Sequence, residues 1–550
     1  MMGNSRENRK SDWIRGHAEL AAFAVTLLGL VARLWTASGT FLNPDEALHF
    51  RLANQVSMAL AYKAGLTAFH PPLLTLVLHF WRAFGASELW LRLPSVLAGA
   101  VFCWMFYKWL GNAAGSLAGF IGLLFVALLP PVVLLAAEVR QYALLLAFLA
   151  SSLYFLDEAF AKNSTSRMAA FSLCLCLAML SHYSAFLFAT ALGIYVLLRI
   201  FTEHSPARLV SAWAIGQLAA LALALFLYET HVSKLGAGKS TTAPQGWTGA
   251  LWTSELHLHR SYFDRAHDNP IVFLAGHTFG VFQYFFGQLA VGDAMGLLFV
   301  VGVVLLLRGK GFPAARPSTR PLGLFLLLPF AIAGGASLAH VYPYGGTRHL
   351  AFLVIPGVAG VSVAIARLAA GSTEERWARG LAIAALVIAA CIAFVNPRPP
   401  RMDRADQSRT HMAAAMEFIG NIHQSDLIVT DYQTDLIVGH YLCRQRPVSL
   451  DAAPVGFEQF FCGGHRVVST TAEWVFSLEN FPNEWQRFVQ SYRLRPGTAV
   501  WILQAGWGVD LLEELQRHFA EFHDVHLVSF GGNIKIFKLT VGQPMPAAVP

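Results

Sequence analysis

Long apolar runs alternate with short polar segments along most of the chain before residue 396. The runs are about 18 to 22 residues long, the length that an α-helix needs to cross a hydrocarbon core of about 30 Å. Hydropathy in a 19-residue window therefore predicts a polytopic α-helical membrane protein with about 11 transmembrane helices. The predicted spans lie near residues 18–36, 92–109, 114–135, 142–158, 168–181, 185–201, 209–228, 288–307, 322–339, 350–367 and 380–395.

The pattern changes after a proline-rich sequence at residues 396–400. Segments of helical and of strand periodicity alternate there, which predicts a C-terminal soluble α/β domain at 397–550 after a transmembrane domain at 1–396. Helices are expected near residues 410–422, 484–492 and 509–521, and strands near 426–430, 499–503, 525–530 and 534–540. The acids of this domain are scattered, so we expect it to cover the site or help select the acceptor.

Composition supports the membrane assignment. Only 13% of the residues are charged and 55% are hydrophobic, whereas a soluble domain has about 25% charged residues. The net charge is 40 − 33 = +7, but the basic residues lie in short loops between apolar runs. Such loops set membrane orientation, and nucleic acid is discarded as a partner.

The positions of the basic residues predict the topology. Under the positive-inside rule the loops that carry them are cytoplasmic. They are Arg6, Arg9, Lys10 and Arg15 before the first span, Arg308, Lys310, Arg316 and Arg320 between the eighth and ninth, and Arg376 and Arg379 before the last. The N-terminus is then inside, on a retained first helix in a cell (inner) membrane, and the C-terminal domain is extracytoplasmic. Two long outer loops follow, 37–91 and 229–287. Cys443 and Cys462 would both face an oxidising compartment, and whether they pair is left open.

The most informative motif is Asn43-Pro44-Asp45-Glu46-Ala47-Leu48-His49, directly after the first span. Adjacent carboxylates at a membrane surface cost desolvation energy unless something pairs or uses them. One interpretation is catalytic. The other is that Asp45 caps a helix and Glu46 lies in its first turn, where the helix dipole favours an acid.

Further polar clusters lie at span ends on the same predicted outer side. The clusters are His70-Pro71-Pro72-Leu73, Gly85-Ala86-Ser87-Glu88, Arg92-Leu93-Pro94-Ser95, Glu138-Val139-Arg140-Gln141-Tyr142, His182-Tyr183-Ser184 and Tyr342 to His349. Each cluster has a structural explanation by itself, such as snorkelling arginines or an aromatic belt. Their joint placement favours function.

Five of these motifs, taken in order, resemble the bacterial glycosyltransferases of the GT-C superfamily, in the branch related to protein O-mannosyltransferases and lipid A aminoarabinose transferases. They are Asp-Glu at 45–46, His-Pro-Pro-Leu at 70–73, Arg-x-Tyr-Ala-Leu at 140–144, His-Tyr-Ser-Ala at 182–185 and Arg-His at 348–349. The resemblance covers roughly residues 20–370. It implies a GT-C fold, a donor sugar linked to undecaprenyl or dolichyl phosphate, and transfer to an acceptor hydroxyl on the outer face of the bilayer. Glu88 is the candidate for a second acid that some relatives carry.

The residue chemistry agrees with that implication. A sugar on a polyprenyl phosphate has a good leaving group, so one carboxylate suffices as the base and cations hold the departing phosphate. We therefore expect Asp45 to act as base with Glu46 in support, and in-line displacement to invert the anomeric carbon. Arg140 and Arg348, with His349, are the expected phosphate ligands. The other candidate substrate-binding residues are His70, Glu88, Tyr142, His182 and Tyr183.

Two alternative functions remain open at this point: a transporter or flippase, and a degenerate, purely scaffolding member, against which Asp45 and Arg140 argue. A transporter or flippase of lipid-linked saccharides would also place charges near the membrane, but it should carry ionisable groups near the midplane and repeat symmetry, whereas these spans are nearly free of charge. The acceptor is an unknown glycan, lipid or protein. No cofactor is required by the pattern, and an assisting divalent metal is left open, with His257, His259, His267 and Asp268 as the candidate ligands outside the motifs.

Overall fold

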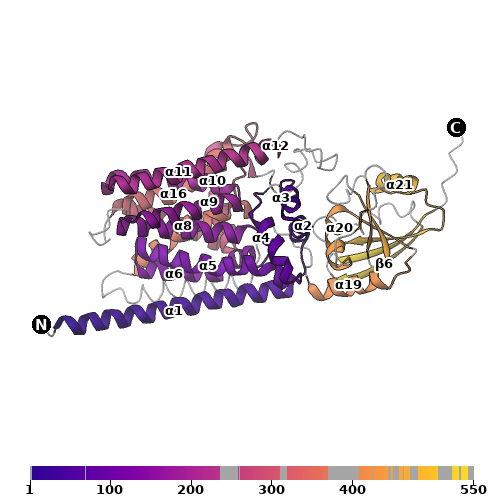
Figure 1. The fold of residues 1–550 in the computed structure, drawn as a ribbon, viewed down its shortest axis with the longest axis horizontal. Coiled ribbons are helices and arrows are strands. Elements are labelled where there is room, and N and C mark those ends of the chain that lie inside the picture. The colour runs from indigo at the N-terminus through magenta and orange to yellow at the C-terminus, as the bar shows by residue number, and fades with distance from the viewer. Residues whose placement is uncertain are drawn as a thin grey trace.

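The structure is a computed structural model. It describes residues 3–68, 70–235, 258, 261–309, 319–369, 408–424, 426–443, 448–449, 457–462, 464–470, 481–505, 523–531 and 534–542. A long helical bundle forms one end of the molecule and a sheet-containing domain forms the other, with the N-terminus at the far end of the bundle (Figure 1). The short helices α2, α3 and α4 lie at the end of the bundle that faces the domain (Figure 1).

The described helices of the bundle follow the predicted spans closely. Their bounds are α1 Gly3–Gly39, α2 Pro44–Ala53, α3 Met58–Gly65, α4 Leu73–Trp81, η1 Arg82–Phe84, α5 Glu88–Ala114, α6 Ser116–Leu128, α7 Pro130–Ala136, α8 Tyr142–Lys162, α9 Thr165–Ser181, α10 Ser184–Glu203, α11 Ala207–Leu227, η2 Tyr228–Val232, α12 Ser233–Leu235, α14 Pro270–Phe286, α15 Leu289–Arg308, α16 Thr319–Leu338, η4 Arg348–Leu353 and α17 Val354–Ala369.

Eight helical segments in the described part are long and apolar enough to cross a membrane, or nine if the bent pair α6 and α7 is one span. The eight coincide with eight of the predicted spans. The predicted span 168–181 corresponds to α9, a shorter apolar helix of 17 residues. The predicted span 380–395 lies outside the described residues.

The predicted span 114–135 is not one straight helix. Helices α6 and α7 meet at 65°, because Leu129 precedes Pro130 and adopts an extended conformation, φ −58° and ψ 120°. Carbonyl groups near the end of α6 accept hydrogen bonds from Arg33, whose side chain is fully buried. Its guanidinium donates to the Val126 and Ala127 carbonyls at 2.9 and 3.0 Å. Arg33 lies near the outer end of the span predicted at 18–36, and it stabilises the carbonyl end of a helix inside the bundle.

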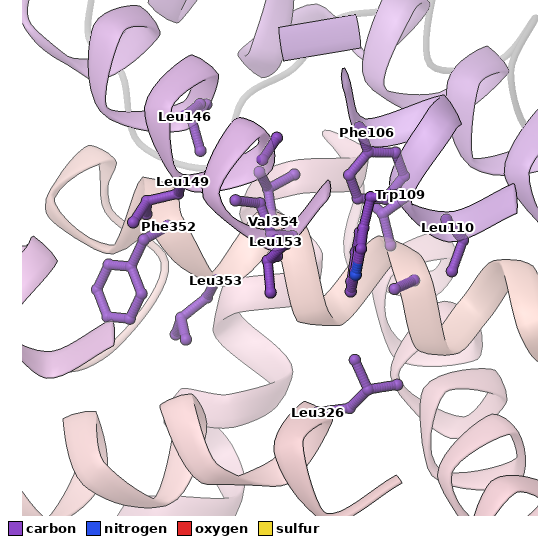
Figure 2. Packing of buried hydrophobic residues seen from close by; sticks show 14 of the residues in the cluster. Phe106, Trp109, Leu110, Leu146, Leu149, Leu153, Leu326, Phe352, Leu353 and Val354 are labelled. Carbon is purple, nitrogen blue, oxygen red and sulfur yellow. The ribbon is translucent and has the colours of Figure 1, made fainter. Parts of the chain in front are cut away.

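The bundle core consists of aliphatic and aromatic side chains from helices distant in sequence. Figure 2 shows Trp109 of α5 beside Phe106 and Leu110, near leucines of α8, and residues of η4 and α17. Helix α17 is buried over most of its length. Arg348, at the start of η4, is thereby attached to a buried and rigid element.

The C-terminal part contains a seven-stranded sheet in the order β2-β3-β4-β1-β5-β7-β6. Strand β1 pairs in parallel with β4 and β5, and the other pairs are antiparallel. Two core clusters cover the sheet, one with α19 and α20 and one with α21. The element bounds are α19 Arg409–Asn421, β1 Leu427–Thr430, α20 Tyr432–Tyr441, β2 Val448–Ser449, β3 Phe457–Cys462, β4 His465–Thr470, α21 Phe481–Ser491, β5 Ala499–Gln504, β6 His523–Gly531 and β7 Ile534–Thr540.

Most predicted elements of this part are present. Helices α19 and α21 and strands β1, β5, β6 and β7 match the expected positions. The predicted helix 509–521 lies outside the described residues, and the sequence pattern missed α20 and strands β2 to β4. Cys443 is disulfide-bonded. The side chain of Cys462, whose pairing with Cys443 the sequence left open, lies outside the described part.

Polar contacts attach the C-terminal domain to helix α2. Arg51 of α2 donates to Asp435 of α20 at 3.0 Å and to Glu458 of β3 at 2.9 Å. Tyr441 accepts from the backbone N–H of Leu42 at 2.8 Å, just before α2 begins. The helix that carries the Asp-Glu motif is therefore held between the bundle and the domain.

Candidate active site

Helix α2 begins with a complete capping box. The side chain of Asn43 accepts from the backbone N–H of Glu46 at 3.1 Å, and Glu46 accepts from the backbone N–H of Asn43 at 3.0 Å. Pro44 occupies the first turn, where its missing N–H costs nothing. The cap is therefore Asn43, and the interpretation that Asp45 caps this helix is wrong. The Asp45 carboxylate is left available for other contacts.

Glu46 is a fully buried anchor. Arg92 of α5 donates to both carboxylate oxygens of Glu46, from Nε and from one terminal nitrogen, each at 2.7 Å. The backbone N–H of Val139 donates to the same carboxylate at 2.7 Å. Arg92 also donates to carbonyls at the end of α1 and beyond it, among them Phe41 at 2.8 Å. Glu46 thus ties α1, α2, α5 and the segment before α8 together, and its oxygens are occupied by protein donors.

Asp45 lies between two arginines that are far from it in sequence. It forms an ion pair with Arg140, in the turn before α8, and another with Arg348, at 2.9 Å between a terminal nitrogen and Oδ2. Arg140 and Asp45 are 3% and 13% exposed, whereas Arg348 is 27% exposed. A carboxylate and two guanidinium groups therefore meet at one end of the bundle, with Arg348 the most accessible of the three.

Backbone contacts fix the turn that carries Arg140. The hydroxyl of Ser95 in α5 donates to the Arg140 carbonyl at 3.0 Å. Glu138, two residues earlier, has a carboxylate oxygen 3.9 Å from Arg140 Nε. The same turn supplies the Val139 N–H that binds Glu46. The position of Arg140 is thus coupled to the Glu46 anchor.

A row of four rings lies beside these charges. The ring centroids of His49 and His70 are 5.8 Å apart, those of His70 and His182 are 5.4 Å apart and stacked, and those of His182 and Tyr142 are 5.1 Å apart. We refer to His49, His70, His182 and Tyr142 as the ring row. Helix α2, the segment before α4, the turn before α10 and the start of α8 each contribute one member.

The histidines of the ring row are held neutral. Burial lowers the pKa of His49 to about 4, with a further contribution from Arg348. Burial and then Arg140 lower the pKa of His182 to about 3. Burial also lowers the pKa of His70 well below its usual value, with neighbouring histidines adding to the effect. These rings therefore present neutral donors and acceptors through the physiological pH range.

Two sequence candidates lie elsewhere. Glu88 accepts from Tyr441 at 3.0 Å and from Arg409 at 3.3 Å, so it contacts the C-terminal domain. The Tyr183 hydroxyl is bound to His231. Ion pairs and ring contacts bring together six of the predicted site residues: Asp45, His70, Arg140, Tyr142, His182 and Arg348. His349 contributes to lowering the pKa of His70.

Sequence reasoning did not assign roles to three further residues in or next to this site. His49 belongs to the ring row, Arg92 holds Glu46, and the Tyr342 hydroxyl donates to the His349 carbonyl at 3.0 Å. The sequence could have indicated His49 and Arg92 as site residues, because both belong to the motifs at the predicted outer side. Which carboxylate Arg92 binds is a tertiary property that spacing does not reveal.

No group of three or more histidines, cysteines or acids suited to a metal ion occurs among the described residues. His257 and His259 of the suggested loop ligands lie outside the described part. His267 instead contacts Asp264 at 2.7 Å on the surface.

Comparison with known proteins agrees with this architecture. Residues 69–229 match the family model of dolichyl-phosphate-mannose-protein mannosyltransferases. No curated protein matches the chain in sequence. The matched segment contains three members of the ring row and Arg140.

Solved structures share the fold. The apo structure of ArnT from Cupriavidus metallidurans has a TM-score of 0.52 at 12% identity and covers 98% of this chain and 100% of its own. The same protein bound to undecaprenyl phosphate has a TM-score of 0.50 at 12% identity, with 98% and 99% covered. The archaeal oligosaccharyltransferase AglB from Archaeoglobus fulgidus, in complex with an inhibitory peptide and a dolichol-phosphate, has a TM-score of 0.50 at 10% identity, with 96% and 75% covered. This multi-pass membrane protein therefore shares the fold of ArnT and AglB, and its residues 69–229 match the mannosyltransferase family model.

Proposed function

We propose that the protein is an inverting glycosyltransferase that moves a sugar from a polyprenyl-phosphate donor to an acceptor hydroxyl at the outer face of the cell membrane. The observation that carries the proposal is the meeting of Asp45 with Arg140 and Arg348 at one end of the bundle. This constellation contains the base and the phosphate ligands that such a transfer needs. The lipid phosphates in the similar ArnT and AglB structures support the donor class.

The ion pairs suggest an order of events. A phosphate that enters beside Arg140 and Arg348 accepts hydrogen bonds from their guanidinium groups, which otherwise face Asp45. Guanidinium groups bind phosphate oxygens in a bidentate manner. An Asp45 oxygen is then free to accept the proton of the acceptor hydroxyl. The acceptor oxygen forms a bond to the anomeric carbon as the bond from that carbon to the phosphate oxygen breaks on the opposite face. The electron pair leaves with the polyprenyl phosphate, whose charge the arginines stabilise.

Replacing Arg140 or Arg348 by lysine tests the phosphate assignment. Lysine keeps the charge but loses the planar fork, so each variant should weaken transition-state binding of the donor by about 1–3 kcal/mol. The measurement is kcat and KM for a polyprenyl-phosphate sugar with purified protein. Arg199→Lys is a matched control, because Arg199 of α10 is a buried arginine that pairs with Asp157 near the end of α8 and with Glu203 on its own helix. Donor kinetics that change no more in the two site variants than in this control would contradict the assignment.

Membrane orientation is part of the proposal. The N-terminus and the C-terminal domain lie at opposite ends of the bundle (Figure 1), and the disulfide of Cys443 suits an oxidising compartment. We therefore place the N-terminus in the cytoplasm and the C-terminal domain, with the Asp45 site beside it, outside.

Reporter fusions at the two chain ends test this orientation. A reporter active only outside the cytoplasm should be active when fused after Pro550 and inactive when fused before Met1. The basic residues before the first span provide the physical reason, since they resist translocation. Equal activity at both ends, or the reverse pattern, would contradict the topology.

A further inference from the structure

The ring row contains buried polar atoms that the protein itself does not satisfy. Among the described residues, His49 Nδ1, His70 Nδ1 and the Tyr142 hydroxyl have no hydrogen-bond partner. His49 is 4% exposed and Tyr142 is 1% exposed. Each such atom costs about 1–3 kcal/mol when nothing satisfies it. All three belong to one continuous row, where the hydroxyl groups of a bound ligand would satisfy them.

The row also has the right surroundings for a ligand that adjoins the phosphate. The charge of Arg348 lowers the pKa of His49 at one end of the row, and the charge of Arg140 lowers the pKa of His182 near the other end. These are the two arginines that meet at Asp45. A group bound along the row is therefore next to the proposed phosphate position and the proposed base.

The charges of this region favour a ligand without charge of its own. The acids nearby already face arginines: Asp45 pairs with Arg140 and Arg348, Glu46 with Arg92, and Glu138 lies near Arg140. An ammonium group here would meet two guanidinium groups and neutral imidazoles. A carboxylate on the ligand would compete with the donor phosphate for the same two arginines.

From this geometry we infer that the ring row is the subsite for the donor's sugar and that this sugar is uncharged, with hydroxyl groups where an amino sugar or a uronic acid carries a charge. The inference rests on the proposed function and adds the substrate class. Imidazole and phenol rings pack against the C–H face of a pyranose or furanose ring, while their polar atoms exchange hydrogen bonds with its hydroxyls.

A matched set of donors tests the charge. Glucose, mannose and galactose are each attached to undecaprenyl phosphate as the neutral sugar, as the amino sugar and as the uronic acid. Transfer or donor cleavage by the purified full-length protein is measured as kcat/KM, with Asp45→Asn beside it. We expect a neutral donor to exceed its two charged counterparts by at least about tenfold, from the loss of one hydrogen bond or one like-charge contact.

The outcomes of this experiment distinguish the claim that the sugar is uncharged from the claim that the protein is a glycosyltransferase. A preference for an amino sugar or a uronic acid, in turnover that Asp45→Asn abolishes, would overturn the sugar class and leave the glycosyltransferase standing. Turnover that does not depend on Asp45, or none with any donor, would end both.

Removal of the Tyr142 hydroxyl tests the subsite itself. Tyr142→Phe keeps the ring and should lower kcat/KM for the preferred donor about tenfold. For one of its monodeoxy analogues, the same substitution should have little effect, because the hydroxyl that Tyr142 binds is already gone. Tyr154→Phe on the same helix is the control for a lost hydroxyl outside the row, with unchanged kinetics expected. Equal losses for the parent donor and every deoxy analogue would assign Tyr142 a structural role and overturn the inference.

Discussion

Asp45→Asn is expected to lower kcat for sugar transfer by about 10²-fold to 10⁴-fold, the range that a general base contributes. The structure makes this substitution informative, because Asn43 and not Asp45 caps α2. Asparagine at position 45 preserves side-chain size and leaves the capping box intact. It removes the basic oxygen and the negative charge that Arg140 and Arg348 face.

The measurement pairs the rate of transfer with the melting temperature of the same preparation. Asp157→Asn is the matched control, because Asp157 is also a buried aspartate paired with an arginine, Arg199, away from the site. The control should lose stability and keep its rate per folded molecule. Asp45→Asn also removes the counter-charge of two arginines and should lose stability too, but unlike the control it should lose its rate per folded molecule. Near-normal transfer by the Asp45 variant would remove Asp45 from the chemistry.

The second large effect concerns stability. Glu46→Gln leaves the buried guanidinium of Arg92 without a counter-charge, and breaking a buried pair in this way costs about 3–5 kcal/mol. Glutamine has an NH2 group in place of one carboxylate oxygen, so two of the four hydrogen bonds that Glu46 accepts lose their acceptor, one from Arg92 and one from the backbone N–H of Val139 or Asn43. We expect a large fall in melting temperature in detergent or nanodiscs, with a rate that falls only in proportion to the folded fraction.

Glu19→Gln provides the comparison for this stability effect. Glu19 pairs with Lys108 at 2.9 Å, but both side chains are 30–45% exposed, and such pairs contribute about 0–1 kcal/mol. A Glu46→Gln protein that is as stable as the wild type yet inactive would show that Glu46 takes part in the reaction, and its role and that of Asp45 would have to be exchanged.

Most of the helical architecture could be predicted from the sequence because membrane spans are governed by local hydrophobicity. The bend between α6 and α7 follows from Pro130 and Pro131, which an average over 19 residues does not register. The binding of Arg33 to the end of α6 depends on two helices that approach each other. Strands β3 and β4 were missed because their apolar residues face partners on both sides, which removes the simple alternation that marks a half-buried strand. Helix α20 was missed because polar residues, among them Gln433 and Asp435, occupy buried positions in it.

The site was predictable as a set of residues, but their pairing was not. The motifs named Asp45, Arg140 and Arg348 from segments up to 303 positions apart, and the fold brings them together. The sequence predicted Asp45 as the base and Glu46 as its support, but it could not identify Asn43 and Arg92 as the partners of Glu46. Glu88 and Tyr183 were selected because they lie at the same predicted membrane surface, yet their contacts are with the C-terminal domain and with His231.

The location of α2 gives the C-terminal domain a structural role near the site. Arg51, six positions after Asp45 on the same helix, binds Asp435 and Glu458 of the domain. Asp431 caps α20 by accepting from the Thr434 N–H at 2.9 Å. These acids are used in docking and in capping.

The central claim is tested most directly by following a labelled sugar through one reaction with the purified protein in liposomes. The sugar is supplied either on undecaprenyl phosphate or on a nucleotide, together with an envelope extract as the acceptor source. The account predicts that label leaves undecaprenyl phosphate, that free undecaprenyl phosphate accumulates in equal amount, and that the nucleotide sugar remains intact. Transfer from the nucleotide sugar, or movement of the intact lipid-linked sugar across the liposome without cleavage of its phosphate bond, would contradict it.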